Sequence, residues 1–261
     1  MSEGIMIHPT ALVDGDAQVH GEADIGPYTI IGPNVEIGRG TCIESHVVIK
    51  GPTSIGEDNH IFQFASIGDD PQDKKYDGKT TTLELGDRNT IREYCTINRG
   101  TAQDRGVTQL GSDNWLMAYA HIAHDCVVGN NTVFANNASI AGHAHIGDWV
   151  ILGGFTAVHQ FCHIGIHAMT SMFTYVTKDL PAYVTVSGRP AVPRGVNSEG
   201  LKRRGFTKTK IQNIRNAYRT VYREGLRLEE ALEVLENEAS QHSELVPFVE
   251  SLRYSDRGLV R

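Results

Sequence analysis

The feature that most constrains this chain is an aliphatic residue that returns at every sixth position from residue 7 to residue 67. The series reads Ile7, Val13, Val19, Ile25, Ile31, Ile37, Ile43, Ile49, Ile55, Ile61 and Ile67, and it resumes later as Leu110, Leu116, Ile122, Val128, Phe134, Ile140, Ile146, Leu152, Val158 and Ile164. A period of six fits neither a helix nor a flat, half-buried strand. It is typical of a solenoid of short parallel strands, a hexapeptide β-helix, in which the aliphatic residue of each hexad points inward.

Two polar segments interrupt the hexads, at residues 68–84 and 98–109, and long loops in a compact domain are usually functional or disordered. The repeat fades after Ile164, and from Glu199 onward apolar residues recur at helical spacing. We predict a β-helix domain over residues 1–190 that carries both loops, followed by a small helical domain over residues 191–261. Pro247 is expected to end or kink a helix there.

Composition indicates an ordinary soluble protein, with 40% apolar residues and a net charge of −7. No apolar run approaches the roughly 20 residues that cross a bilayer, and the first ten residues do not resemble a secretory signal. The four cysteines lie far apart without a C-x-x-C pair, so neither a disulfide framework nor a thiolate zinc site is expected. We therefore predict a cytoplasmic protein without stable membrane insertion.

Residues 201–223 form a basic block without a single acidic residue. Its members are Lys202, Arg203, Arg204, Lys208, Lys210, Arg215, Arg219 and Arg223. Such a block in an acidic protein indicates an anionic partner, although a solvated helix face would have the same composition. The overall acidity and the lack of interleaved aromatic residues argue against nucleic acid.

Seven of the twelve histidines fall between positions 121 and 167. If three hexads make one turn, residues 18 positions apart stack on successive coils about 4.8 Å apart. His124 then lies in one column with Gly142 and Gln160. Asp125 lies beneath His143 in the next column, with His159 on the other side, and His145 stacks with His163.

This convergence predicts a catalytic site outside the prism. His124 would be a general base oriented by Asp125, and Gly142 has no side chain to block its amide from an oxyanion. A ladder of surface histidines or a set of metal ligands is the alternative for any single histidine. The register of Asp, Gly and Gln with the histidines favours catalysis.

Several motifs resemble the UDP-N-acetylglucosamine O-acyltransferases of lipid A biosynthesis. They are the run His121-Ile-Ala-His124-Asp125-Cys126, the segments Ala141-Gly142-His143 and His159-Gln160-Phe161, and the run Asn197-Ser-Glu199-Gly-Leu-Lys-Arg-Arg-Gly205-Phe206. The resemblance covers essentially the whole chain. It implies a left-handed parallel β-helix, a homotrimer with active sites between subunits, and transfer of a 3-hydroxyacyl group from acyl carrier protein to the 3-hydroxyl of UDP-N-acetylglucosamine, without cofactor or metal.

The resemblance also assigns roles to individual residues. His124, Asp125 and Gly142 would be catalytic. The residues implied to bind substrate are Asp73, Lys75, His121, His143, His159 and Gln160, together with Asn197, Glu199, Arg203 and Arg204 near the uridine and diphosphate. Acyl carrier protein is acidic, so it would suit the basic block.

Two positions depart from the family's usual pattern. Asn98 stands where the family usually has histidine, and because an amide cannot titrate, its role here is not acid–base chemistry. Met172 stands where members that use long acyl chains often have glycine, at the end of the acyl groove. A methionine there fills space that about four methylenes would take, which predicts a donor near ten carbons.

Two other functions remain open from the residues alone. A zinc hydratase of the gamma carbonic anhydrase type would need three imidazoles that converge across a subunit interface. A non-catalytic solenoid would show regular polar ladders, not two irregular loops and a clustered His/Asp/Gln patch.

Overall fold

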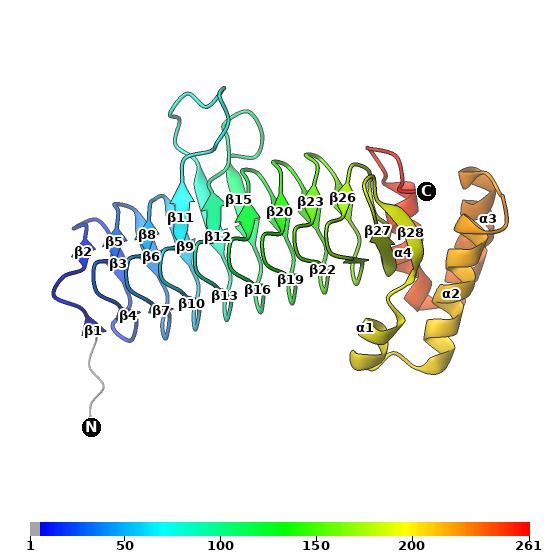
Figure 1. Ribbon diagram of the computed structural model, residues 1–261, viewed down its shortest axis with the longest axis horizontal. Helices are drawn as coiled ribbons and strands as arrows, with labels where there is room; N and C mark the ends of the chain where they lie inside the picture. The colour runs from blue at the N-terminus through cyan, green and yellow to red at the C-terminus, as the bar shows by residue number, and fades with distance from the viewer. Residues whose placement is uncertain (1–5) are drawn as a thin grey trace.

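The computed structural model describes residues 6–261, so residues 1–5, where the predicted first domain starts, lie outside the described part. The chain winds into a three-sided prism of short parallel strands and ends in a group of helices (Figure 1). The two polar loops leave the prism side by side on one edge (Figure 1).

Each side of the prism is one sheet, and its strands are parallel except for the last pair of the first sheet. The first contains β1 (Met6–Ile7), β4 (Asp24–Ile25), β7 (Cys42–Ile43), β10 (His60–Ile61), β13 (Thr90–Ile91), β16 (Trp115–Leu116), β19 (Val133–Phe134), β22 (Ile151–Leu152), β25 (Met169–Thr170), β27 (Val184–Ser187) and β28 (Val192–Val196). The second contains β2 (Leu12–Val13), β5 (Ile30–Ile31), β8 (Val48–Ile49), β11 (Ser66–Asp69), β14 (Thr96–Asn98), β17 (His121–Ile122), β20 (Ser139–Ile140), β23 (Ala157–Val158) and β26 (Tyr175–Val176). The third contains β3 (Gln18–Val19), β6 (Val35–Ile37), β9 (Thr53–Ile55), β12 (Thr82–Leu85), β15 (Val107–Leu110), β18 (Val127–Val128), β21 (His145–Ile146) and β24 (His163–Ile164).

The hexad residues form the core, as predicted. From Ile25 onward they are nearly all buried, whereas Ile7 in the first described coil is 40% exposed. Strand partners lie 18 positions apart, for example Ile122 opposite Ile140. The predicted stacking interval is therefore confirmed.

The register shifts where the loops leave. Leu85 pairs with Ile55, 30 positions earlier, and Leu110 pairs with Leu85, 25 positions earlier. The irregular segments themselves are residues 70–81 and 99–106, shorter than predicted, because β11, β12, β14 and β15 extend into the polar stretches.

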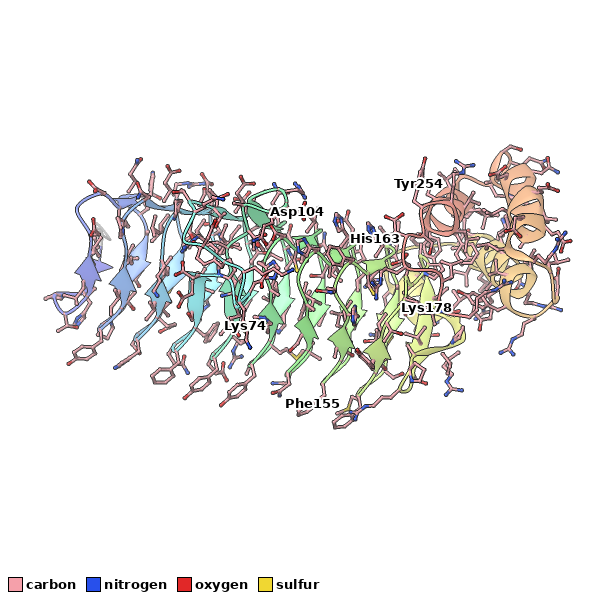
Figure 2. All side chains as sticks on the ribbon, turned by 90° about the horizontal axis from the view of Figure 1, so that it is seen from above. Lys74, Asp104, Phe155, His163, Lys178 and Tyr254 are labelled. Carbon is pink, nitrogen blue, oxygen red and sulfur yellow. The ribbon has the colours of Figure 1, made fainter. Side chains whose placement is uncertain are left out.

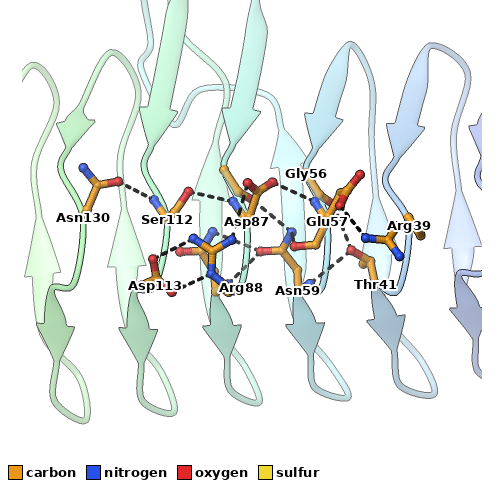
Figure 3. A network of polar contacts seen from close by, with 12 residues as sticks. Arg39, Thr41, Gly56, Glu57, Asn59, Asp87, Arg88, Ser112, Asp113 and Asn130 are labelled. Carbon is orange, nitrogen blue, oxygen red and sulfur yellow. Dashed lines mark hydrogen bonds and ion pairs between the residues drawn. The ribbon is translucent and has the colours of Figure 1, made fainter.

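Buried polar ladders hold neighbouring coils in register (Figure 3). Asn59 Oδ1 accepts from the Asn89 backbone N–H at 2.9 Å, and Asn89 Oδ1 accepts from the Asn114 N–H at 2.9 Å. In the same turns, Asp87 Oδ1 accepts from the Glu57 N–H, and Ser112 Oγ accepts from the Asp87 N–H. The asparagine ladder continues where coils are 18 positions apart, because Asn114 Oδ1 accepts from the Thr132 N–H. These bonds satisfy backbone groups of the turns in regular and shifted coils alike.

The helical part contains α1 (Ser198–Arg203), α2 (Lys208–Tyr222), α3 (Leu228–Ala239), a 3₁₀ turn η1 (Ser243–Leu245) and α4 (Val246–Arg253). β28 pairs antiparallel with β27, so residues 192–196 belong to the first sheet and not to the helices. The division at residue 190 stays a prediction. The expectation for Pro247 was wrong, because it lies in the first turn of α4, where its missing N–H needs no partner. No helix within residues 6–261 is both long and apolar enough to cross a membrane.

Candidate active site

The predicted column of site residues is built from equivalent corners of three successive coils. His124 and Asp125 lie between β17 and β18, and Gly142 with His143 lies one coil further. Asp125 and His143 both adopt left-handed φ angles, +57° and +62°, which turn the chain sharply from one sheet to the next. This repeated turn places equivalent side chains above one another.

His124 is paired with a carboxylate that is almost fully buried. Its Nδ1 lies 2.9 Å from Asp125 Oδ2, and the Asp125 side chain is 0% exposed against 15% for His124. An ionised carboxylate only accepts hydrogen bonds, so Nδ1 carries the proton and Nε2 keeps a free lone pair. The geometry suits a general base.

Asp125 is held as an anion by further donors from the second loop. The Thr101 N–H donates to Asp125 Oδ1 at 2.9 Å and the Thr101 hydroxyl donates to Oδ2 at 2.7 Å. Burial opposes ionisation of Asp125, but the hydrogen bonds from His124 and Thr101 outweigh it and lower the pKa of the carboxyl. Asp125 therefore stays charged at neutral pH.

Gly142 leaves room for the His124 ring. A β-carbon at Gly142 would lie 2.5 Å from His124 Cε1 and 2.7 Å from Nε2, closer than such atoms approach. Within the part of the chain that the structure describes, the Gly142 N–H donates no hydrogen bond to another backbone group. The oxyanion role of this N–H stays a prediction.

His143 has its own carboxylate partner, which the sequence did not reveal. Its Nδ1 lies 2.6 Å from Asp104 Oδ2 and 3.9 Å from Asp125 Oδ2. The ring stacks on Phe161 with centroids 4.4 Å apart and meets the His124 ring edge-on. Asp104 comes from the second loop, beyond a register shift, so no stacking rule could place it.

A cavity of about 1400 Å³ lies over these corners. Most of the predicted site residues line it, namely Asp73, Lys75, His121, His124, Gly142, His143, His159 and Gln160. The volume exceeds the ~300–1,000 Å³ of ordinary small-molecule pockets, so the cavity has room for more than one small ligand. Three of the residues that line the cavity are labelled in the view from above, namely Lys74 and Asp104 of the two loops and His163 of the prism (Figure 2).

The remaining cavity residues hold the two loops and the C-terminal tail in place. Gln103 Nε2 donates to Lys75 O at 3.1 Å, which joins the first loop to the second. Arg257 reaches His159 Nδ1 at 3.2 Å, and its backbone N–H donates to the buried Asp179 at 3.0 Å. The spacing of the hexads could not place Arg257 beside His159, because it lies in the tail, 98 positions further along the chain.

Burial affects His121, another of the histidines that line the cavity. It lowers the pKa of His121, which keeps the ring neutral, and His121 Nδ1 lies 2.7 Å from the Thr96 hydroxyl. His145 and His163 stack at 4.4 Å, as predicted. Asn98 is buried, and its side-chain amide donates to Asp70 O at 3.0 Å, so it fixes the base of the first loop and does not face the cavity.

Four residues expected at the uridine and diphosphate do not line this cavity. Asn197 caps α1 and donates to His167 O at 3.0 Å, and Arg204 donates to His167 Nδ1 at 3.0 Å. Glu199 and Arg203 are exposed. Within one chain, these four residues therefore do not line the same cavity as His124.

Comparison with known proteins identifies the family. A sequence profile described as UDP-N-acetylglucosamine O-acyltransferase, domain 2, matches residues 179–260, and a bacterial transferase hexapeptide profile matches residues 25–51 and 108–142. The acyl-[acyl-carrier-protein]–UDP-N-acetylglucosamine O-acyltransferase of Herminiimonas arsenicoxydans is 55% identical over 98% of this chain and 99% of its own length. The chain belongs to this acyltransferase family. The Janthinobacterium relative of the same name is 56% identical over the same shares.

Solved structures of the family agree with this assignment. LpxA from Acinetobacter baumannii is 48% identical, with a TM-score of 0.95 over 98% of this chain and 99% of its own. The Francisella novicida UDP-N-acetylglucosamine acyltransferase is 43% identical, with a TM-score of 0.96 over 98% of this chain and 94% of its own. The predicted fold, a left-handed parallel β-helix followed by a small helical domain, is confirmed, and so is the recognition of the family.

Proposed function

We propose that this acyltransferase moves a 3-hydroxyacyl group from acyl carrier protein to the 3-hydroxyl of UDP-N-acetylglucosamine, the first step of lipid A biosynthesis, with His124 as the general base. The observation that carries the assignment of the base is the pair formed by His124 Nδ1 and the buried Asp125 at 2.9 Å. The pair orients a free Nε2 beside Gly142 at the cavity wall.

In the proposed mechanism, His124 Nε2 takes the proton of the sugar 3-hydroxyl as its oxygen attacks the thioester carbonyl. Charge on the resulting oxyanion is stabilised by the Gly142 N–H. The C–S bond then breaks, and the imidazolium returns its proton to the departing thiolate of the carrier. Asp125 stabilises the transient imidazolium without taking its proton.

The other cavity residues are proposed to bind substrate. Asp73 and Lys75 reach the cavity from the first loop, and His121, His143, His159 and Gln160 line it from the prism. The pairing of His143 with Asp104 fixes the ring so that its Nε2 is left for substrate. None of these roles requires a metal or a cofactor.

The partner that delivers the acyl group is proposed to dock on the basic block. Arg215, Arg219 and Arg223 are exposed on and just beyond α2, four positions apart, and therefore share one face of the helix. Acyl carrier protein is acidic, so charge complementarity would steer its approach. We also propose a cytoplasmic location, which agrees with the use of acyl carrier protein and UDP-N-acetylglucosamine as substrates.

The active unit is proposed to be a homotrimer. One edge of the prism exposes aromatic rings, stacked as Tyr28, His46, Phe64, Tyr94 and Tyr119, with Phe155 on Phe173 further along. Side chains project along this edge past Phe155 (Figure 2). An exposed ridge of aromatic rings of this kind favours contact with other copies of the chain. A neighbouring protomer could then supply Asn197, Glu199, Arg203 and Arg204 to the cleft that contains His124.

Mixing two inactive variants tests this shared site. His124→Ala and Arg203→Ala would each be dissociated, mixed and reassembled. Mixed trimers regain activity if one cleft combines an intact His124 with an intact Arg203 from its neighbour. If the acyl-transfer activity of the mixed trimers does not exceed that of either variant alone, His124 and Arg203 belong to a site within one chain.

The reaction itself is tested with UDP-N-acetylglucosamine and a panel of 3-hydroxyacyl carrier proteins. We expect transfer that survives treatment with a strong chelator. Absence of transfer with every donor would refute the proposal, and loss of transfer on chelation would show that the reaction requires a metal.

A further inference from the structure

A second cluster of metal-binding residue types lies on the outer face of the first sheet, whereas His124 and Gly142 follow strands of the second sheet. Cys42, Glu44 and His60 each offer a ligand atom, and these atoms lie within 4.8 Å of one another. All three side chains are half-buried. None of them lines the cavity that contains His124.

The register of the coils creates this cluster. Cys42 in β7 pairs directly with His60 in β10, so their side chains leave the same face of the sheet on adjacent coils. Glu44 follows β7 by one residue, and its carboxylate Oε1 lies 2.9 Å from His60 Nε2. On the other side of Cys42, Asp24 in β4 occupies the equivalent position. Four residues with ligand atoms thus lie on three consecutive coils.

The local charge favours a cation. Among residues 6–261, no lysine or arginine forms an ion pair with Glu44 or Asp24, and the one partner of Glu44 is His60. The His60 ring also stacks on Phe62, with centroids 4.1 Å apart, which restricts its orientation. Glu44 and Asp24 thus place negative charge on both sides of Cys42, which a divalent ion would offset.

We propose that Cys42, Glu44 and His60 bind a zinc-type divalent ion. Thiolate, imidazole and carboxylate are the ligands that this class of ion prefers, and a tetrahedral shell places its donors at separations that small side-chain rotations would reach here. Water completes the shell, with Asp24 beside it. On binding, the thiol releases its proton to solvent, and the His60 proton moves from Nε2 to Nδ1 so that Nε2 can coordinate.

The proposed ion has a structural role and does not depend on acyl transfer. It would clamp β7 to β10 in the N-terminal half of the prism, in addition to the strand pairing and core packing that join these coils. Metal binding should therefore raise the melting temperature and leave the transfer rate unchanged.

Cobalt(II) is the probe that separates this site from the active site. A thiolate ligand gives cobalt a near-ultraviolet charge-transfer band, and the other three-residue group in residues 6–261, His124 with Asp125 and His143, contains no thiol. The full chain is stripped of metal and titrated with cobalt, then with zinc in competition. We expect one equivalent to produce the band and zinc to abolish it.

Single substitutions test which residues bind the ion. Cys42→Ser should remove the band, and His60→Ala should weaken binding at least about tenfold. His46→Ala is the matched control, because His46 lies in the aromatic ridge between Tyr28 and Phe64 and should bind cobalt like the wild type. Circular dichroism checks that each variant is folded. An unchanged band in a folded Cys42→Ser variant, or no band in the wild type, would overturn the proposal.

Discussion

Replacing Gly142 with alanine tests how closely the active site depends on the position of one imidazole. The new methyl group would lie 2.5 Å from His124 Cε1 and 3.1 Å from Nδ1, so the ring must move away. That movement breaks the 2.9 Å hydrogen bond between Nδ1 and Asp125. A displacement of about 1 Å in a catalytic group costs roughly 10²-fold in rate, which corresponds to about 2.7 kcal/mol of transition-state stabilisation.

The assay is steady-state acyl transfer to UDP-N-acetylglucosamine, with thermal unfolding measured in parallel. We expect kcat to fall roughly 100-fold while KM for the sugar changes little, because the residues that bind the sugar stay in place. Gly32→Ala is the matched control, since the atom nearest to its new methyl group is Ile49 O at 3.4 Å, an ordinary contact. A Gly142→Ala enzyme with nearly wild-type kcat would refute the reasoning.

Three further predictions follow from particular contacts. Met172→Gly should lengthen the preferred acyl donor beyond about ten carbons, by about four methylenes, and an unchanged donor profile would contradict the proposed role of this exposed side chain. Asp104→Asn removes the charge 2.6 Å from His143 Nδ1 and should lower kcat/KM by about tenfold; a wild-type value would show that the pair is dispensable. Burial and the nearby Arg204 lower the pKa of His167 to about 4, so the unfolded chain binds the extra proton. The neutral, buried His167 ring therefore makes its full contribution to the free energy of unfolding above the ordinary pKa of 6.5. That contribution is lost as pH falls toward 4, by up to about 3 kcal/mol. Urea unfolding at pH 7.5 and pH 5 should show this loss of stability in the wild type, and the loss should be smaller in His167→Phe. An equal pH dependence of stability in the two proteins would contradict this role of His167.

The sequence predicted those parts of the site that obey the repeat. His124, Gly142 and Gln160 lie in one column because each follows its hexad residue by the same number of positions, and the coil supplies the rest of the geometry. The buried partner Asp125 and its neighbour His143 follow from the same rule. A regular solenoid converts sequence spacing directly into distance.

The repeat spacing does not predict the positions of residues in the loops and the tail. Thr101 and Asp104 lie between β14 and β15, where the register shifts, so their positions depend on a loop conformation that the hexads do not define. Arg257 reaches the site from the C-terminal tail, which is held by contacts such as the one from the Arg257 backbone N–H to Asp179. The resemblance to the family pointed to Arg204, but in one chain its side chain packs over Trp149 and contacts His167.

The central claim is that His124 acts as the general base in acyl transfer to UDP-N-acetylglucosamine. The most direct measurement is the transfer rate of a folded His124→Ala enzyme with a saturating 3-hydroxyacyl carrier protein. Removal of a general base costs about 10²–10⁴-fold, so we predict a loss of at least about 100-fold with unchanged sugar binding. An His124→Ala enzyme that transfers the acyl group at close to the wild-type rate would contradict the account.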